Sequence, residues 1–251
     1  RGVVFCISPW NFPLAIFCGQ LSAALIAGNT VIAKPASSTV LIATKFIELL
    51  FDCGLPREAV QLVPGPSVIS GTPVVTSSNV QAVMLTGSNA TAKSISKDLS
   101  SREGAIVPLI AETGGMNSMI VDSTALTEQV VQDVIDSAYK SAGQRCSALR
   151  VLYVQEEVFD KTVMMLKGAM AELIIGDPSC LNVDVGPVID ERAYNALMSH
   201  VEYLSTTDAE LLYETPSESS YEKGTFFMPR MYKISGIELL KEEVFGPVLH
   251  I

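Results

Sequence analysis

The sequence has few charged residues and little positive charge. Only 18% of its 251 residues are charged, and the 27 acidic side chains outnumber the 17 basic ones, which leaves a formal net charge of −10. The basic residues form no cluster along the chain. This composition argues against nucleic acid or an anionic membrane surface as the partner of the segment.

No two cysteines lie close together in the sequence, and the sequence contains only two histidines. The five cysteines are widely spaced with no C-x-x-C pair, so they form neither a zinc pattern nor a disulfide framework. We therefore expect no metal site, a reducing compartment and a cytoplasmic location. Because most cysteines are small buried core residues, we expect this role for four of the five: Cys6, Cys18, Cys53 and Cys180.

No uninterrupted apolar run is long enough to suggest a membrane span. The longest apolar stretch covers residues 2–33, but it is broken by Pro9, Asn11, Pro13, Gln20 and Asn29. No signal peptide is recognisable, because a strand-like run directly follows the first residue, Arg1. The sequence stops within another strand-like run, so we expect both ends to be cut from a longer protein.

Hydrophobic residues make up 48% of the chain, and their pattern alternates between strands and helices. In the first half we predict strands at 2–7 and 30–33 and helices at 13–27 and 38–53. In the second half we predict a helix from about 126 to 142, and the polar stretch 206–224 indicates a surface loop or irregular hairpin. The alternation predicts an α/β fold with parallel sheets, divided into domains at 1–114 and 115–251.

Five motifs place a reactive or polar side chain beside a break in the chain. They are SPWNFP (8–13), AKPA (33–36), ETGG (112–115), GQRCS (143–147) and EEVFGP (242–247). In this order they resemble the aldehyde dehydrogenase superfamily. The stretches PLIAETGG, MIVDSTALTEQVV, SAGQRCSALRV and GPVID resemble more narrowly the glutamate-semialdehyde dehydrogenase module of the bifunctional proline utilization A (PutA) proteins, and the resemblance covers nearly the whole chain.

The resemblance implies a partial Rossmann-type NAD-binding domain followed by a partial catalytic domain. It also implies that Cys146 attacks the aldehyde, that hydride passes to NAD, and that a thioester remains on the cysteine. Glu112 resembles the base that activates water to hydrolyse this thioester; a strand-end carboxylate beside two glycines can be partly desolvated, which would raise its pKa. Asn11 would donate its amide to the substrate oxyanion. The ordinary alternatives are a structural cysteine, a solvent-facing carboxylate and a turn asparagine.

The resemblance also implies a set of cofactor contacts. Lys34 would bind the adenosine ribose, Ser88 at a helix N-terminus the pyrophosphate, Glu243 the nicotinamide ribose, and Phe245 would line the nicotinamide site. Further cofactor-binding positions are Ser8, Pro9, Trp10, Ser37 and Gly87. The sequence has no G-x-G-x-x-G fingerprint, and surface charge is the alternative interpretation of Lys34 and Glu243.

Two serines bear on specificity. Many NAD-preferring members carry glutamate where this sequence has Ser37, and serine removes its repulsion of a 2′-phosphate, so we expect tolerance of NADP. Ser147 follows the nucleophile and resembles a serine that helps to hold the substrate carboxylate, although a small residue chosen for packing would also suit this position.

Three other functions compete with this interpretation. A cysteine hydrolase would need a Cys–His pair, but His200 and His250 lie in no recognisable signature. A scaffold fragment without activity is a second alternative, and a succinate- or aminoadipate-semialdehyde dehydrogenase is a third. The resemblance implies a homo-oligomeric bacterial parent, peripheral to the inner membrane in some relatives, with an upstream FAD-dependent proline dehydrogenase. We expect the isolated chain to have little or no turnover.

Overall fold

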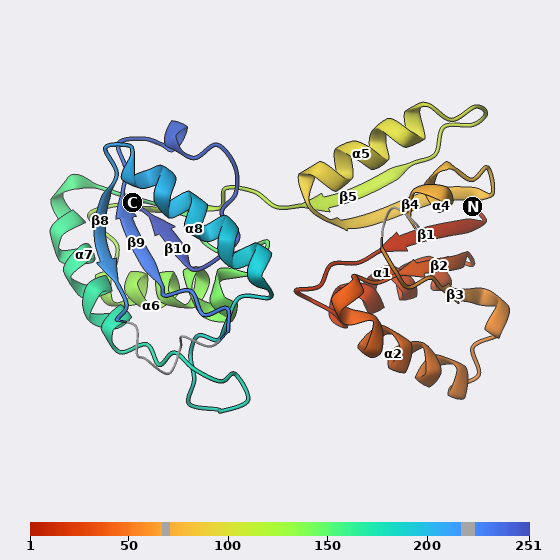
Figure 1. Cartoon of the computed structure of the whole chain (residues 1–251), viewed down its shortest axis with the longest axis horizontal. Helices are drawn as coiled ribbons and strands as arrows, with labels where there is room; N and C mark the ends of the chain where they lie inside the picture. The colour runs from red at the N-terminus through yellow and green to blue at the C-terminus, as the bar shows by residue number, and fades with distance from the viewer. Residues whose placement is uncertain (67–70, 217–223) are drawn as a thin grey trace. The chain divides into compact units, whose positions relative to one another are not determined.

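The computed structural model describes residues 1–66, 71–216 and 224–251. These residues form two compact units, Arg1–Gly114 and Gly115–Ile251 (Figure 1). Each unit is built on a five-stranded sheet, and nearly all of the strand pairs are parallel. The predicted α/β class with parallel sheets is confirmed.

The sheet of the first unit has the strand order β3-β2-β1-β4-β5, and every neighbouring pair is parallel. Its strands are β1 (Val3–Ile7), β2 (Thr30–Lys34), β3 (Val60–Leu62), β4 (Val80–Gly87) and β5 (Leu109–Thr113). The chain moves outward from β1 to β3 and then returns to the other side of β1. The strand order therefore reverses between β1 and β4. Doubly wound sheets bind their ligands at the carboxyl ends of the two strands between which this reversal occurs.

Helices cover both faces of this sheet because successive strand residues point to opposite sides. Val4 and Cys6 pack in one apolar cluster that includes α1 (Ala15–Ile26) and α2 (Val40–Asp52). Phe5, which lies between them in sequence, packs in a second cluster with residues of α4 (Thr72–Thr76) and α5 (Asn89–Ser100). Burial on both faces explains the near-continuous apolar runs of the sequence.

The sheet of the second unit has the order β6-β7-β10-β9-β8. Its strands are β6 (Ser118–Val121), β7 (Val151–Val154), β8 (Glu210–Glu214), β9 (Arg230–Lys233) and β10 (Val248–His250). Only β8 runs antiparallel, against β9. The polar stretch 206–224, predicted as a loop or irregular hairpin, thus contributes an edge strand, and its residues 217–223 lie outside the described part of the chain.

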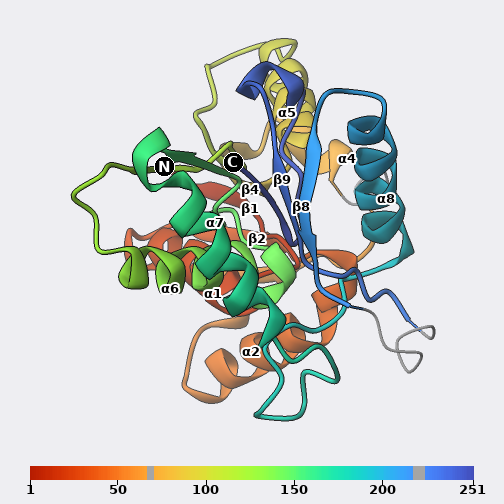
Figure 2. The same ribbon diagram turned by 90° about the vertical axis from the view of Figure 1, so that its left-hand side faces the viewer.

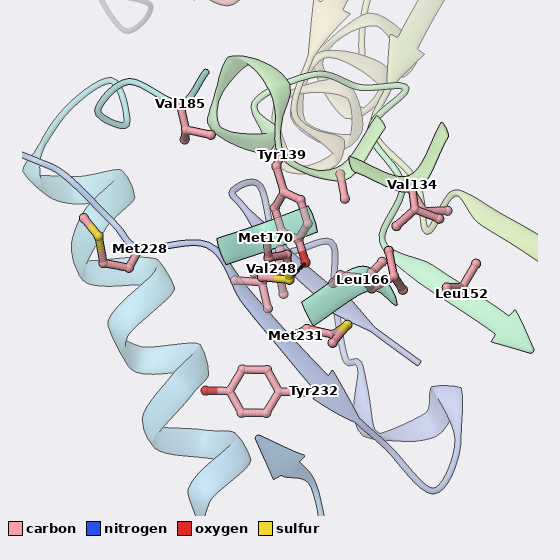
Figure 3. Close-up of a cluster of buried hydrophobic side chains, with 14 of the residues drawn as sticks. Val134, Tyr139, Leu152, Leu166, Met170, Val185, Met228, Met231, Tyr232 and Val248 are labelled. Atoms are coloured by element: carbon pink, nitrogen blue, oxygen red, sulfur yellow. Dashed lines mark hydrogen bonds between the residues drawn. The ribbon is translucent and has the colours of Figure 1, made fainter. Parts of the chain in front are cut away.

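The core of the second unit joins α6 (Thr127–Ala138), α7 (Glu156–Ala171) and α8 (Glu191–Ser205) to the sheet. Figure 2 shows α7 and α8 on opposite sides of β8 and β9. Tyr139, at the end of α6, is fully buried, and its hydroxyl lies 3.3 Å from the sulfur of Met170 (Figure 3) and donates to the carbonyl oxygen of Arg230 at 3.3 Å. This side chain fixes the end of α6, from which the loop bearing Cys146 departs.

Helix α6 ends earlier than the sequence suggested. The predicted helix runs to about residue 142, but α6 stops at Ala138 and a short 3₁₀ segment, η3 (Lys140–Gly143), follows. Within η3 the backbone is left-handed at Ser141 (φ 57°) and Ala142 (φ 53°). Such conformations cost non-glycine residues about 1 kcal/mol or more, and they tend to occur at functional sites.

Two of the expected core cysteines are not buried. Cys6 is buried and Cys18 is partly buried, but Cys53 and Cys180 are exposed, and all five cysteines are free thiols. Cys53 follows α2 as its C-terminal cap, and Cys180 lies in the turn after Asp177, so neither faces a core. Among the described residues, no helix is both long and apolar enough to cross a membrane, and no group of three or more candidate ligands is placed to hold a metal ion.

Candidate active site

The first unit gathers several of the predicted site residues at one edge of its sheet. Ile7, the last residue of β1, pairs with Lys34 at the end of β2, and the Ser8 amide donates to the Lys34 carbonyl oxygen at 3.1 Å. Gly87 ends β4, and Glu112 lies near the end of the neighbouring β5. The carboxyl ends of parallel strands lie along the same edge of a sheet. These residues therefore lie along the carboxyl edge, which includes the point between β1 and β4 where the strand order reverses.

Two polar groups at this edge are buried without adequate partners. The hydroxyl of Ser8 has no hydrogen-bond partner among the described residues. The Lys34 side chain is only 3% exposed, and in the described chain its ammonium makes a single long hydrogen bond, 3.4 Å, to the carbonyl oxygen of Pro35. Burial lowers the pKa of Lys34. Buried donors of this kind are costly unless a ligand satisfies them, and the hydroxyls of a bound nucleotide would do so.

Ser88 is the N-cap of α5, as the sequence predicted for a helix start. Its hydroxyl oxygen accepts from the Thr91 amide at 3.2 Å and lies 2.9 Å from the Thr91 hydroxyl. The residue is exposed at the N-terminus of a 12-residue helix. Such an end, with its free amides and positive dipole, is suited to a phosphate oxygen.

The remaining predicted residues of the first unit lie nearer the surface. Asn11 is partly buried in the bend between β1 and α1, beside the partly buried Pro9 and Trp10. Ser37 is exposed, and its hydroxyl donates to the Gly65 carbonyl oxygen at 3.5 Å. Glu112 is also exposed, so the partial desolvation expected for its carboxylate is not found in the described chain.

In the second unit Cys146 lies on the loop between η3 and β7. Both Cys146 and Ser147 are exposed. The amide of Asn117 donates to the carbonyl oxygens of Cys146 (2.6 Å) and Ala148 (3.0 Å), which holds the loop on both sides of Ser147. Sequence reasoning did not select Asn117, although a polar residue between the ETGG motif and a strand was a signal for it.

Arg150 is the second residue that sequence reasoning missed. It is 1% exposed and forms an ion pair with Glu243, with 2.9 Å between the guanidinium Nη2 and the carboxylate Oε1. The guanidinium carbon lies 5.2 Å from the ring centroid of Phe245. The structure thus brings the loop of Cys146 together with Glu243 and Phe245, which lie almost 100 positions further along the chain. A lone arginine at the start of an apolar strand was the available signal.

The comparisons with known proteins agree over the whole chain. Residues 1–251 match the model of the aldehyde dehydrogenase family. The chain is 49% identical to the bifunctional protein PutA of Klebsiella aerogenes over 100% of its own length and 20% of that protein, and 34% identical to a 1-pyrroline-5-carboxylate dehydrogenase of Geobacillus kaustophilus over 99% of this chain and 48% of that protein.

Solved structures show the same likeness. A crystal structure of a bifunctional proline utilization A protein superimposes with a TM-score of 0.95 at 50% identity, over 100% of this chain and 25% of that one. A betaine aldehyde dehydrogenase of Staphylococcus aureus in complex with NAD⁺ superimposes with a TM-score of 0.94 at 28% identity, over 99% of this chain and 50% of that one.

The chain belongs to the aldehyde dehydrogenase family. Within that family it is homologous to the PutA proteins and to the 1-pyrroline-5-carboxylate dehydrogenases, and it spans about a fifth of the length of the curated PutA relatives.

Proposed function

We propose that the protein to which this chain belongs oxidises L-glutamate γ-semialdehyde, the open form of 1-pyrroline-5-carboxylate, to L-glutamate with NAD. The observation that carries this proposal is the 49% identity to PutA across the full chain, which includes the exposed Cys146 on its fixed loop. The homology to 1-pyrroline-5-carboxylate dehydrogenases supports the same substrate. By the same resemblance, the parent is a cytoplasmic homo-oligomer with a fused, FAD-dependent proline dehydrogenase.

The chemistry begins at the sulfur of Cys146. Its thiolate attacks the aldehyde carbon and forms a thiohemiacetal whose oxygen carries the negative charge. The amide of Asn11 and the backbone N–H of Cys146 donate to this oxygen, and preorganised donors of this kind each contribute about 3 kcal/mol to the transition state. Bound NAD supplies the acceptor for the hydride that leaves the carbon. Loss of hydride restores the carbonyl group and leaves an acyl thioester on Cys146.

Glu112 acts in the second half of the reaction. Its carboxylate takes a proton from water as the water attacks the thioester carbonyl, and the carbon–sulfur bond then breaks. The products are a carboxylate and the free cysteine, ready for another aldehyde. Because Glu112 is exposed on β5, water has direct access to it in the described chain.

The buried donors of the first unit support a cofactor at the carboxyl edge of its sheet. Ser8 and Lys34 would bind nucleotide hydroxyls, and the N-terminus of α5 at Ser88 would bind the pyrophosphate, beside Gly87. In the second unit Glu243 would bind the nicotinamide ribose and Phe245 would line the nicotinamide. Pro9 and Trp10 would complete the site, and Ser37 would lie beside the adenosine ribose.

Substrate choice separates this proposal from another semialdehyde dehydrogenase of the family. Ser147 is exposed beside Cys146, and in this proposal its hydroxyl helps to hold the carboxylate of the substrate. The test compares kcat/KM of the full-length protein for 1-pyrroline-5-carboxylate and for succinate semialdehyde. We expect a preference for the first of about 100-fold, since a charged group held in a shaped site is discriminated strongly. A preference for succinate semialdehyde would keep the mechanism and reject the proposed substrate.

A further inference from the structure

Arg150 is buried at the point where the loop of Cys146 meets the loop of Glu243. We propose that Arg150 is a positioning residue: it holds one oxygen of the Glu243 carboxylate, presents the other oxygen to the nicotinamide ribose, and fixes the backbone before Cys146 with the same guanidinium. This role rests on the proposed function and adds a residue to it.

All five N–H groups of the Arg150 guanidinium are engaged. Nε and Nη2 donate to Oε1 of Glu243 at 3.2 and 2.9 Å. Nη2 also donates to the carbonyl oxygen of Arg145 at 3.0 Å, and Nη1 donates to those of Gly143 (2.7 Å) and Gly246 (3.2 Å). Two of the acceptors thus lie within three residues of Cys146, and two belong to the Glu243 loop. A planar fork with five donors is needed to make this set, and lysine cannot reproduce it.

The ion pair leaves half of the Glu243 carboxylate available. Both hydrogen bonds from Arg150 end on Oε1, and within the described chain Oε2 has no partner. The Glu243 side chain is 15% exposed, whereas that of Arg150 is 1% exposed. Because Arg150 binds one oxygen, the carboxylate of Glu243 already has a fixed orientation before a ribose binds. Its other oxygen can then accept hydrogen bonds from the two ribose hydroxyls.

Charge and backbone packing both favour a fixed arrangement. Burial lowers the pKa of Arg150, but Glu243 and the negative charge of Cys146 act in the opposite direction and favour the protonated guanidinium. The carbonyl of Arg150 is itself fixed, because it accepts from both the backbone amide and the Nδ1 of His250 at 3.0 Å. The two loops also touch directly, since a Cβ on Gly143 would overlap the carbonyl oxygen of Gly246.

The test uses the full-length protein with the substitution Arg150→Lys and measures the Kd of NAD, kcat and the melting temperature. We expect the Kd of NAD to rise about tenfold and kcat to fall about 100-fold, because misplacement of reacting groups by about 1 Å costs this much. The matched control is Arg230→Lys, which weakens an ion pair of similar length (2.8 Å to Glu214) in the same sheet. For this control we expect changes of about twofold or less in Kd and kcat.

A double variant separates positioning from a general loss of stability. If Arg150 acts through Glu243, then Arg150→Lys combined with Glu243→Gln binds NAD no more weakly than Glu243→Gln alone. The proposal would be overturned if the double variant bound NAD more weakly than Glu243→Gln alone, by the additional factor that Arg150→Lys causes on its own. It would also be overturned if Arg150→Lys melted at a lower temperature but kept the Kd and kcat of the wild type.

If Arg150→Lys does not fold, Glu243→Asp takes its place, because the Glu243 side chain is partly exposed and aspartate keeps its charge. The shorter carboxylate cannot bind Arg150 and reach the ribose together, so we expect the Kd of NAD to rise about tenfold; an unchanged Kd would reject the role of Arg150. A wild-type protein that forms no NADH from any semialdehyde would instead reject the proposed function itself.

Discussion

Glu112 is the exposed next-to-last residue of β5, the edge strand of the first sheet, and its proposed role lies in the hydrolytic half of the reaction. Glu112→Gln should leave hydride transfer intact and block hydrolysis of the thioester. We therefore expect one rapid equivalent of NADH per site, followed by a steady rate lower by about 100-fold or more. Stopped-flow absorbance of NADH measures both phases. A variant that loses the rapid phase along with the steady rate would assign Glu112 to the first half of the reaction.

Ser37 offers a test of cofactor choice at a single exposed position. A serine at this place does not repel a 2′-phosphate, so we expect the wild-type protein to use NADP as well as NAD. Ser37→Glu adds a negative charge at the proposed position of the adenosine ribose and should lower kcat/KM for NADP by about tenfold or more, with NAD little affected. Kinetics with each cofactor measure the ratio. A wild type that is already strictly selective for NAD would refute the expectation.

At the scale of elements, the contact between η3 and the Glu243 loop depends on Gly143. Its φ is 64°, and an added Cβ would overlap the carbonyl of Gly246. We expect Gly143→Ala to lower the free energy of unfolding by about 3 kcal/mol or more. Gly168→Ala is the matched control, because Gly168 lies inside α7 with nothing within 4 Å of its Cβ position.

The control should instead gain about 0.5–1 kcal/mol, since alanine is the better helix former. Urea unfolding followed by circular dichroism measures both variants. Equal destabilisation by the two substitutions would show that the Gly143–Gly246 contact has no special importance.

The elements themselves were largely predictable from apolar periodicity. The strands predicted at 2–7 and 30–33 are observed at Val3–Ile7 and Thr30–Lys34, because buried parallel strands are short apolar runs bounded by turns. Local patterns did not reveal the early end of α6 at Ala138, nor the close approach of Gly143, in the η3 segment that follows, to Gly246, a residue over 100 positions away. Arg150 was missed because its acceptors, three backbone carbonyls and the Glu243 carboxylate, are brought together only by the fold.

For the molecule as a whole, the buried His250 and the partly buried His200 make stability depend on pH. The carbonyl of Arg150 only accepts, so His250 donates to it through Nδ1, and the Nε2 atoms of His250 and His200 lie 2.9 Å apart in a second hydrogen bond. Burial lowers the pKa of His200 and His250 from 6.5 to about 4, although the hydrogen bond to the Arg150 carbonyl opposes the shift at His250, so both rings are neutral near pH 7 in the folded protein.

The sign follows from proton binding. Above pH 6.5 both rings are neutral in the folded and unfolded chain, whereas below it the unfolded chain binds protons that the folded chain does not. Stability should fall as the pH drops from 6.5 towards 4. Urea unfolding at pH 7.5 and pH 5 measures the difference, and His200→Gln should reduce it. If His200→Gln loses as much unfolding free energy between pH 7.5 and pH 5 as the wild type does, then other titrating groups cause the loss.

The proposed roles are spread over both units, with Asn11 and Glu112 in the first and Cys146 in the second. Their joint test belongs to the full-length protein, because the chain spans 20% of the PutA relatives and 48% of the 1-pyrroline-5-carboxylate dehydrogenases.

The most direct measurement is NADH formation from 1-pyrroline-5-carboxylate by the full-length protein, with Cys146→Ser assayed beside it. We expect turnover by the wild type and a loss of about a thousandfold or more in the variant, with the Kd of NAD unchanged, because serine lacks the thiolate. Cys53→Ser, which alters an exposed thiol outside the site, serves as the control and should retain full activity. Turnover in Cys146→Ser close to that of the wild type would contradict the assignment of Cys146 as the nucleophile.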